Sequence, residues 1–241
     1  MNNRYKDYIK LLEDNAYLIS MVPVEELLRF GYEIGLDENS MVLDLCCGYG
    51  TVLKVWSEAF GISGVGVDRE GWFINVGKER LEKAGIDRIK LVCDDVTAYK
   101  DDGKYDVVIC SETIGSISDT LNLGEKYLKR DGILAYHNVF SKIPDPPQEL
   151  ADFDTAVLPL PEFMKIFKEN GYYLIAMASD TAGAWERYVF SQCAKRDVFR
   201  LKENPADSET KDWVDGWYEM YFKYRRPYEG QAMFGLTKIT E

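Results

Sequence analysis

Two acidic residues of this 241-residue chain stand at the ends of apolar runs, and the first is followed by a glycine-rich turn. Asp44 lies in residues 42–53, which read VLDLCCGYGTVL, and Gly48 and Gly50 let a ligand approach the main chain because they lack a Cβ. A carboxylate only accepts hydrogen bonds, so Asp44 should face a donor or a cation rather than a phosphate. Asp68 ends the next run, where acids of nucleotide-binding α/β folds bind ribose hydroxyls. The alternative for Asp68 is a cap on the helix that begins near Gly71.

These carboxylates can meet only if the chain builds a parallel sheet around them. The pattern predicts strands at 41–46, 63–68 and 88–93, separated by helices at 51–60 and 71–84. Such βαβαβ alternation is typical of a parallel sheet, and the continuous apolar runs indicate strands covered on both faces. The carboxyl ends of parallel strands share one edge, which is where open α/β sheets bind ligands.

The glycine turn distinguishes two families with this layout. A dinucleotide fingerprint has a third glycine, which Gly48-Tyr49-Gly50-Thr51-Val52-Leu53 lacks, and Asp44 would repel a pyrophosphate. The stretch instead resembles motif I of class I S-adenosylmethionine (SAM)-dependent methyltransferases, an acid followed by GxGxG, with Cys46 in place of the first glycine. The resemblance implies SAM as cofactor. It also implies an α/β fold, a seven-stranded Rossmann-like sandwich, with a helical cap inserted before the last strand.

The resemblance also assigns cofactor-binding residues. Asp95, after the third strand, matches the acid that accepts from the adenine amino group, with the Val96 N–H near the ring, although the adjacent Asp94 is an alternative. Three carboxylates at three successive strand ends suit a donor-rich, partly cationic nucleoside such as SAM. The full expected set is Asp44, Cys46, Gly48, Gly50, Asp68, Arg69, Asp95, Val96 and Ser111.

The methyl acceptor should meet the cofactor after the fourth strand, at 104–110. Glu112, the only carboxylate there, could orient or deprotonate a substrate, or it could be a solvated loop acid. The fifth strand, at 133–140, carries His137 and Asn138, and alternation lets only one face the pocket squarely. The resemblance favours Asn138 for substrate binding, and His137 is interpreted as a core residue. Beyond Glu112 and Asn138 no catalytic residue can be named.

Helices flank this core at both ends of the chain. Those expected at 4–18 and 23–35 either pack on the core or fold over the cofactor, with Tyr8 or Tyr17 lining the pocket. Further helices at 119–130 and 161–170 and strands at 172–179 and 231–239 complete the pattern.

A long insertion rich in aromatic residues, at 182–228, precedes the last strand. Its W-x-x-Y and R-x-x-x-G motifs, at Trp185 to Tyr188 and Arg226 to Gly230, resemble a bacterial and archaeal group of small-molecule methyltransferases, type 11/25-like. Trp185 and Tyr188 are therefore expected to bind substrate. The alternative is that the insertion packs on the sheet or forms an oligomer surface.

Composition narrows the function further. The net charge of −12 argues against nucleic acid as a partner, and no apolar run reaches the ~18 residues of a membrane span. The charged start is unlike a secretory signal, so a cytoplasmic monomer or homodimer is expected. Five cysteines without a CxxC pair and a single histidine predict no metal site. One domain is expected over 1–241: N-terminal helices (1–40), an α/β core (41–180), a helical cap (181–230) and a last strand (231–241).

The sequence therefore predicts a SAM-dependent methyltransferase that moves a methyl group in line to a small-molecule acceptor. Two alternatives remain. One is an NAD-linked oxidoreductase, and the other is a non-catalytic SAM-binding or interaction protein.

Overall fold

A seven-stranded mixed sheet forms the centre of the molecule. The computed structural model describes residues 3–111, 114–153 and 157–239. The strand order is β3-β2-β1-β4-β5-β7-β6, and β7 runs antiparallel to both of its neighbours. The seven-stranded α/β fold is confirmed, and the antiparallel last strand agrees with it. The strands are β1 Met41–Leu45, β2 Ser63–Asp68, β3 Ile89–Cys93, β4 Tyr105–Cys110, β5 Leu128–Ser141, β6 Tyr172–Ser179 and β7 Glu229–Lys238.

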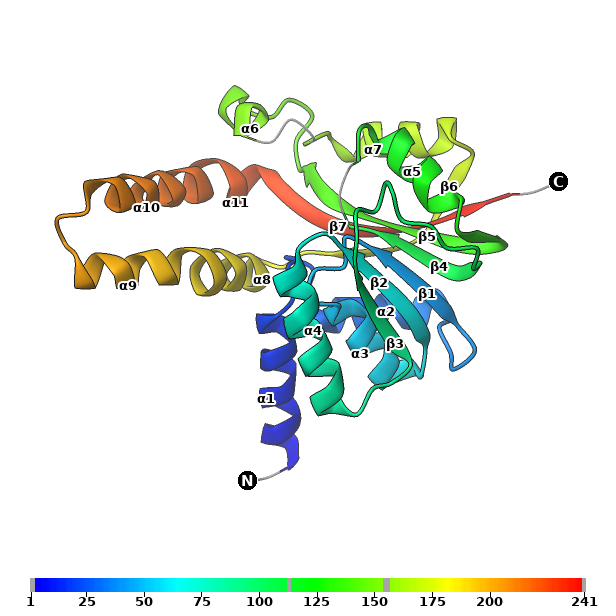
Figure 1. Cartoon of the computed structure of the whole chain (residues 1–241). Helices are drawn as coiled ribbons and strands as arrows, with labels where there is room; N and C mark the ends of the chain where they lie inside the picture. The colour runs from blue at the N-terminus through cyan, green and yellow to red at the C-terminus, as the bar shows by residue number, and fades with distance from the viewer. Residues whose placement is uncertain (1–2, 112–113, 154–156, 240–241) are drawn as a thin grey trace.

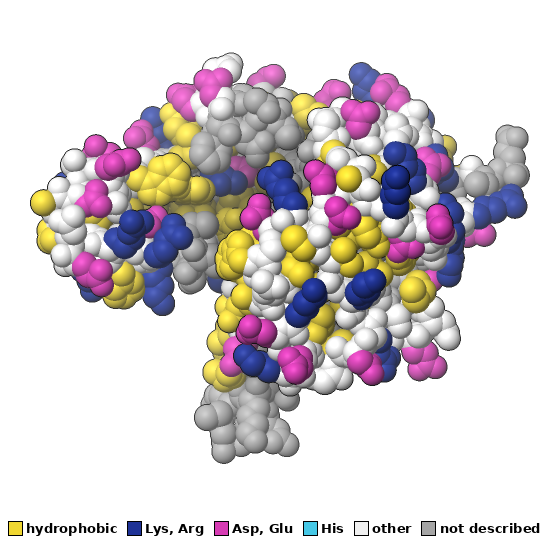
Figure 2. Space-filling model, viewed as in Figure 1, with side chains coloured by type: hydrophobic (Ala, Val, Ile, Leu, Met, Phe, Trp, Pro, Cys, Tyr) yellow, Lys and Arg dark blue, Asp and Glu magenta, His cyan; other side chains and the backbone are white. Residues whose placement is uncertain are grey.

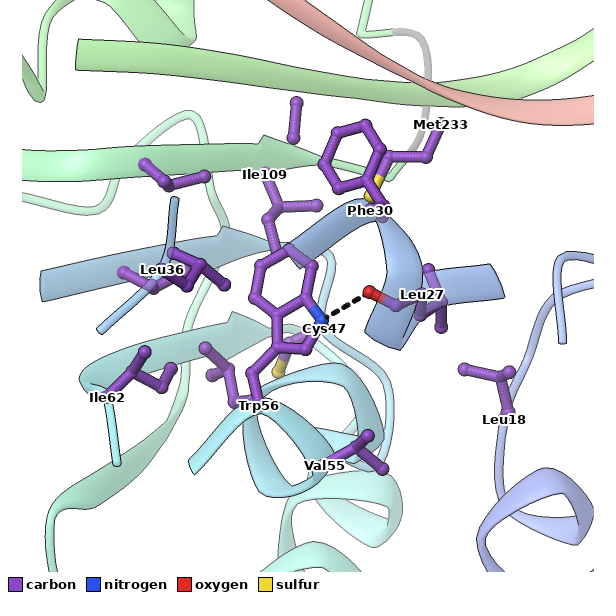
Figure 3. Packing of buried hydrophobic residues seen from close by; sticks show 14 of the residues in the cluster. Leu18, Leu27, Phe30, Leu36, Cys47, Val55, Trp56, Ile62, Ile109 and Met233 are labelled. Carbon is purple, nitrogen blue, oxygen red and sulfur yellow. Dashed lines mark hydrogen bonds between the residues drawn. The ribbon is translucent and has the colours of Figure 1, made fainter. Parts of the chain in front are cut away.

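Helices cover both faces of this sheet (Figure 1). Helices α2 Val24–Glu33, α3 Thr51–Phe60 and α4 Gly71–Ala84 pack on one face, and α5 Ile117–Glu125 and α7 Leu160–Glu169 pack on the other. Alternate strand residues supply the two cores, so that Val42 joins the first and Leu43 the second. Figure 3 shows Trp56 at the centre of the first core, where its Nε1 donates to the Leu27 carbonyl at 2.9 Å.

Two segments differ from the expected elements. Helix α5 ends at Glu125 instead of continuing to 130, because residues 128–132 extend β5, with Leu128 paired to Tyr105 of β4. Residues 148–153, for which no element was expected, form α6 Gln148–Phe153. Neither change moves the carboxyl edge of β1 and β2, which pair in register from Met41↔Ser63 to Leu45↔Val67.

The insertion before β7 is a long helical hairpin that projects away from the sheet, while α1 Asn3–Ala16 extends in another direction (Figure 1). Both arms contain a π-helical stretch, η1 Arg187–Ala194 and η2 Tyr221–Arg225. No helix in the described part of the chain is long and apolar enough to cross a membrane. The remaining helices of the arms are α8 Ala182–Glu186, α9 Lys195–Glu203, α10 Ser208–Met220 and α11 Arg226–Tyr228.

Candidate active site

The glycine turn between β1 and α3 has three residues in the left-handed region. Cys46 has φ 66°, Gly48 has φ 54° and Gly50 has φ 66°. A non-glycine residue at positive φ costs on the order of 1–3 kcal/mol, which explains why the motif that this turn resembles has glycine where Cys46 stands. A Cβ on Gly50 would lie 2.7 Å from Leu91 Cδ2, so Gly50 also allows close packing beneath the turn.

Asp68 braces this turn from the end of β2. Its Oδ2 accepts from the Gly48 N–H at 2.8 Å, and its Oδ1 accepts from the Glu70 N–H at 2.9 Å. The N-cap residue of α4 is Glu70, so Asp68 is not the helix cap. It instead stabilises the turn that precedes the helix. Each carboxylate oxygen has a second lone-pair site, so Asp68 can also accept from a ligand hydroxyl.

Asp44 is the most unusual acid of the site. It is 1% exposed, and its Oδ1 has no hydrogen-bond partner among the described residues. Burial, together with the nearby charge of Asp68, raises the pKa of Asp44 to about 8, although a hydrogen bond with Ser111 opposes this shift. An orphaned buried carboxyl oxygen is costly unless a ligand supplies the missing donor or charge.

Two adjoining cavities lie along this edge of the sheet and share Cys46, Asp68 and Phe73. The first, about 140 Å³, contains Asp44 and Ser111. It is also lined by Gly48, Tyr49 and His137 together with residues 17–20. The second, about 230 Å³, contains Arg69, Glu70, Asp95, Val96, Thr97 and Ile114.

The second cavity brings together the residues expected around an adenine. Asp95 Oδ1 accepts from the Thr97 N–H at 2.8 Å and from its Oγ1 at 2.6 Å, and these bonds lower the pKa of Asp95. Val96 is buried, whereas Arg69 is largely exposed. Asp95 rather than Asp94 lines the cavity. Of the expected cofactor residues, only Gly50 lines neither cavity, because it faces Leu91 instead.

The segment after α1 closes over the first cavity. Tyr17 contacts Tyr49 edge-on at 5.5 Å between ring centroids, and the Tyr17 carbonyl accepts from Thr51 Oγ1 at 2.8 Å. Tyr8 is exposed and lines neither cavity. Buried ion pairs to Asp14 Oδ1, from Lys54 at 2.9 Å and from Arg80 at 3.0 Å, fix the end of α1. Residues 14–20 are therefore held against the glycine turn.

On β5 the structure places His137, not Asn138, on the cavity wall. Asn138 lies on the Tyr136 side of the strand, where its Nδ2 donates to the Tyr136 hydroxyl at 2.8 Å. His137 Nε2 is 3.1 Å from Ser20 Oγ, which donates to Gln231 Oε1 at 2.9 Å. Burial lowers the pKa of His137 to about 4, so its imidazole is neutral at pH 7. Sequence reasoning missed this cluster, because residues 20, 137 and 231 meet only in the tertiary structure.

Of the residues expected to bind substrate, Asn138, Trp185 and Tyr188 lie outside the two cavities. Trp185 is buried at the base of the hairpin, where its Nε1 donates to Asp180 and the Arg225 guanidinium lies 5.1 Å from its ring. Tyr188 packs against the same cluster. Glu112 lies outside the described residues. The W-x-x-Y motif also contains Arg187, which had no expected role.

Arg187 connects the hairpin to the segment over the cofactor cavity. Its guanidinium donates to the carbonyls of Asn15 at 2.6 Å, Leu18 at 3.4 Å and Ser20 at 2.7 Å. Carbonyls at the end of a helix need such donors, because no intrahelical partner remains for them. The contact links the base of the insertion to the residues that line the first cavity.

Comparison with known proteins identifies the class that this geometry indicates. The family model described as "Methyltransferase domain" matches residues 42–132, which run from β1 to the start of β5. A SAM-dependent methyltransferase from Geobacter sulfurreducens, solved with S-adenosyl-L-homocysteine, is 26% identical with a TM-score of 0.84, over 92% of this chain and 94% of that one. Its counterpart from Thiobacillus denitrificans, solved with the same ligand, is 27% identical with the same score and coverage. These similarities support the assignment of the chain to the class I SAM-dependent methyltransferases, with SAM as the cofactor.

A curated relative carries no assigned activity. It is the uncharacterized protein YjhP of Escherichia coli K12, which is 26% identical over 226 residues, or 88% of this chain and 90% of that protein. None of these relatives favours an NAD-linked oxidoreductase or a non-catalytic protein.

Proposed function

We propose that this enzyme methylates a small molecule, with its cofactor lying across the two adjoining cavities. Asp68 would accept from ribose hydroxyls at the shared wall, and Asp95 and Val96 would hold the adenine. The glycine turn and Asp44 would hold the amino-acid portion. The orphaned buried oxygen of Asp44 carries this proposal, since it lies on the wall of a cavity and lacks the donor that a ligand ammonium would supply.

SAM supplies a methyl group activated by its positively charged sulfur. The task of the protein is then mainly to align the acceptor and exclude water, and such positioning can remove ~7–11 kcal/mol of a barrier. Residues 17–20 cover the first cavity, and His137 and Ser20 offer polar atoms on its wall. A neutral His137 can accept a hydrogen bond from an acceptor N–H or O–H group, which makes it a more direct candidate than Asn138.

The small volume of the first cavity and the acidic composition of the chain support a small acceptor over a nucleic acid. The first cavity is only about 140 Å³, and the chain carries a net charge of −12. We retain Trp185 and Tyr188 as proposed contacts on the acceptor side, because their cluster includes Met21, which follows the covering segment.

Calorimetry and product analysis test the proposal together. We expect micromolar binding of SAM and S-adenosylhomocysteine, about −8 kcal/mol, and much weaker binding of NAD. Asp68→Asn should weaken SAM at least tenfold, since hydrogen bonds to a charged acceptor contribute ~1.5–3 kcal/mol each. Exposed Asp87→Asn provides the matched control. Incubation with methyl-labelled SAM and pooled small metabolites should give a labelled product, and tight NAD binding without SAM binding would refute the assignment.

A further inference from the structure

The outer part of the hairpin buries few of its own side chains. Asp197 is the only buried residue of α9, and Val214 is the only buried residue of α10. By contrast, α3 on the sheet buries six residues. Helices this short are marginal in water unless an apolar face packs against something. The two arms therefore expose apolar side chains that a further surface would have to cover.

Large aromatic side chains remain in solvent along these arms. Phe199 is 51% exposed, Trp213 59% and Phe222 55%. Figure 2 shows hydrophobic side chains on the projecting hairpin, interspersed with charges of both signs. Exposed aromatics concentrated on a protruding element are typical of an interaction surface.

The charges on the two arms have opposite signs. Helix α9 carries four basic residues, Lys195, Arg196, Arg200 and Lys202, against two acidic ones. Helix α10 carries four acidic residues, Glu209, Asp212, Asp215 and Glu219, against one basic residue.

The opposite charges of α9 and α10 do not pair with each other within one copy of the described chain. Arg226 pairs with Glu186 across the base of the hairpin, but the ion pairs further out lie along single helical stretches, from Arg196 and Arg200 to Asp197 and from Lys223 to Glu219. Among the described residues, no ion pair joins α9 to α10.

We propose that the hairpin is a homodimer interface, in which two copies pair about a two-fold axis into a four-helix bundle. The axis sets the basic α9 of each copy beside the acidic α10 of the other, so one surface complements itself. The pairing also covers Phe199 and Trp213, as apolar seams do in such bundles. A second copy fits better than an unrelated partner, because a single surface carries both complementary halves.

Sedimentation velocity of the full chain tests the interface. The wild type should be dimeric at micromolar concentration, and Trp213→Asp should be monomeric with unchanged SAM affinity. Tyr32→Asp, which alters an aromatic residue 79% exposed on α2, should stay dimeric. A monomeric wild type, or a dimeric Trp213→Asp, would overturn the proposal.

Charge reversal separates a specific interface from loss of folding. Lys195→Glu with Lys202→Glu makes both arms acidic, and Asp212→Lys with Asp215→Lys makes both arms basic. Each double variant alone should be monomeric, whereas an equimolar mixture should form heterodimers, because the acidic arms of one then face the basic arms of the other. Failure of the mixture to associate, with both variants helical by circular dichroism and binding SAM, would also overturn the proposal.

Discussion

At the scale of single residues, the site depends on carboxylates whose environments differ. Asp95 is exposed and bonded to Thr97, which lowers its pKa, whereas burial beside Asp68 raises the pKa of Asp44 to about 8. The free enzyme therefore holds Asp44 largely protonated at pH 7. A cationic or donor ligand group beside it favours the ionised form and must displace that proton.

We predict that SAM binding at pH 7 releases a proton from Asp44. Binding should also tighten as pH rises from 6 toward 8, because less work is then needed to ionise the group. Calorimetry in two buffers of different ionisation enthalpy measures the proton count. Asp44→Asn should weaken SAM at least tenfold and lose most of the release, and equal release by that variant would assign the proton to another group.

The same shift affects stability. The folded-state pKa lies above the ordinary value of 3.8, so the folded protein binds the proton more tightly than the unfolded chain does. The contribution of Asp44 to stability therefore falls as pH rises from about 4 to about 8. Asp44→Asn should flatten this part of the pH profile of denaturant unfolding. A profile identical to that of the wild type would contradict the buried, protonated state.

At the scale of elements, local sequence patterns predicted the core well. The helices at 51–60 and 71–84 and the strands at 63–68 and 172–179 have the predicted bounds, because glycine turns and apolar runs mark their ends. The early end of α5 was missed, since pairing of Leu128 with Tyr105 is a tertiary effect. The polar cluster around His137 was missed for the same reason.

The coupling between η1 and residues 15–20 leads to a prediction about Arg187. Arg187→Met removes three charge-assisted hydrogen bonds while keeping much of the apolar stem, so the segment over the first cavity should loosen. We expect SAM affinity to fall roughly tenfold, consistent with charged hydrogen bonds of ~1.5–3 kcal/mol. Hydrogen exchange of residues 14–21 should rise in parallel.

Arg226→Met is the matched control, because it removes an arginine whose ion pair, to Glu186, is about half exposed on both sides. Such surface pairs contribute ~0–1 kcal/mol, so affinity and exchange should stay unchanged. Equal effects of the two variants would show that Arg187 acts only through general stability.

At the scale of the whole molecule, the cofactor site and the outer hairpin belong to different parts of the structure. Both cavities lie at the edge of the sheet and are lined by residues between 17 and 137. Arg187, near the base of the hairpin, binds carbonyls of the segment that covers the first cavity, and no residue of α9 or α10 lines either cavity. The insertion was predicted from its length, but its projection away from the sheet was not. The reason is that amphipathic spacing shows which face of a helix is apolar and not what covers it.

This separation predicts that the hairpin can be shortened without loss of cofactor binding. Replacing residues 196–214 by a short Gly-Ser turn removes both Asp197 and Val214, the only buried residues of α9 and α10, and keeps Arg187 and the buried Arg225–Glu229 pair. SAM affinity should stay within about twofold of the wild type, since less than ~0.5 kcal/mol of binding energy is at stake. Calorimetry on the shortened chain, with circular dichroism to verify the fold, measures this. A large loss of affinity in a folded variant would instead mean that the outer arms control the cofactor site over a distance.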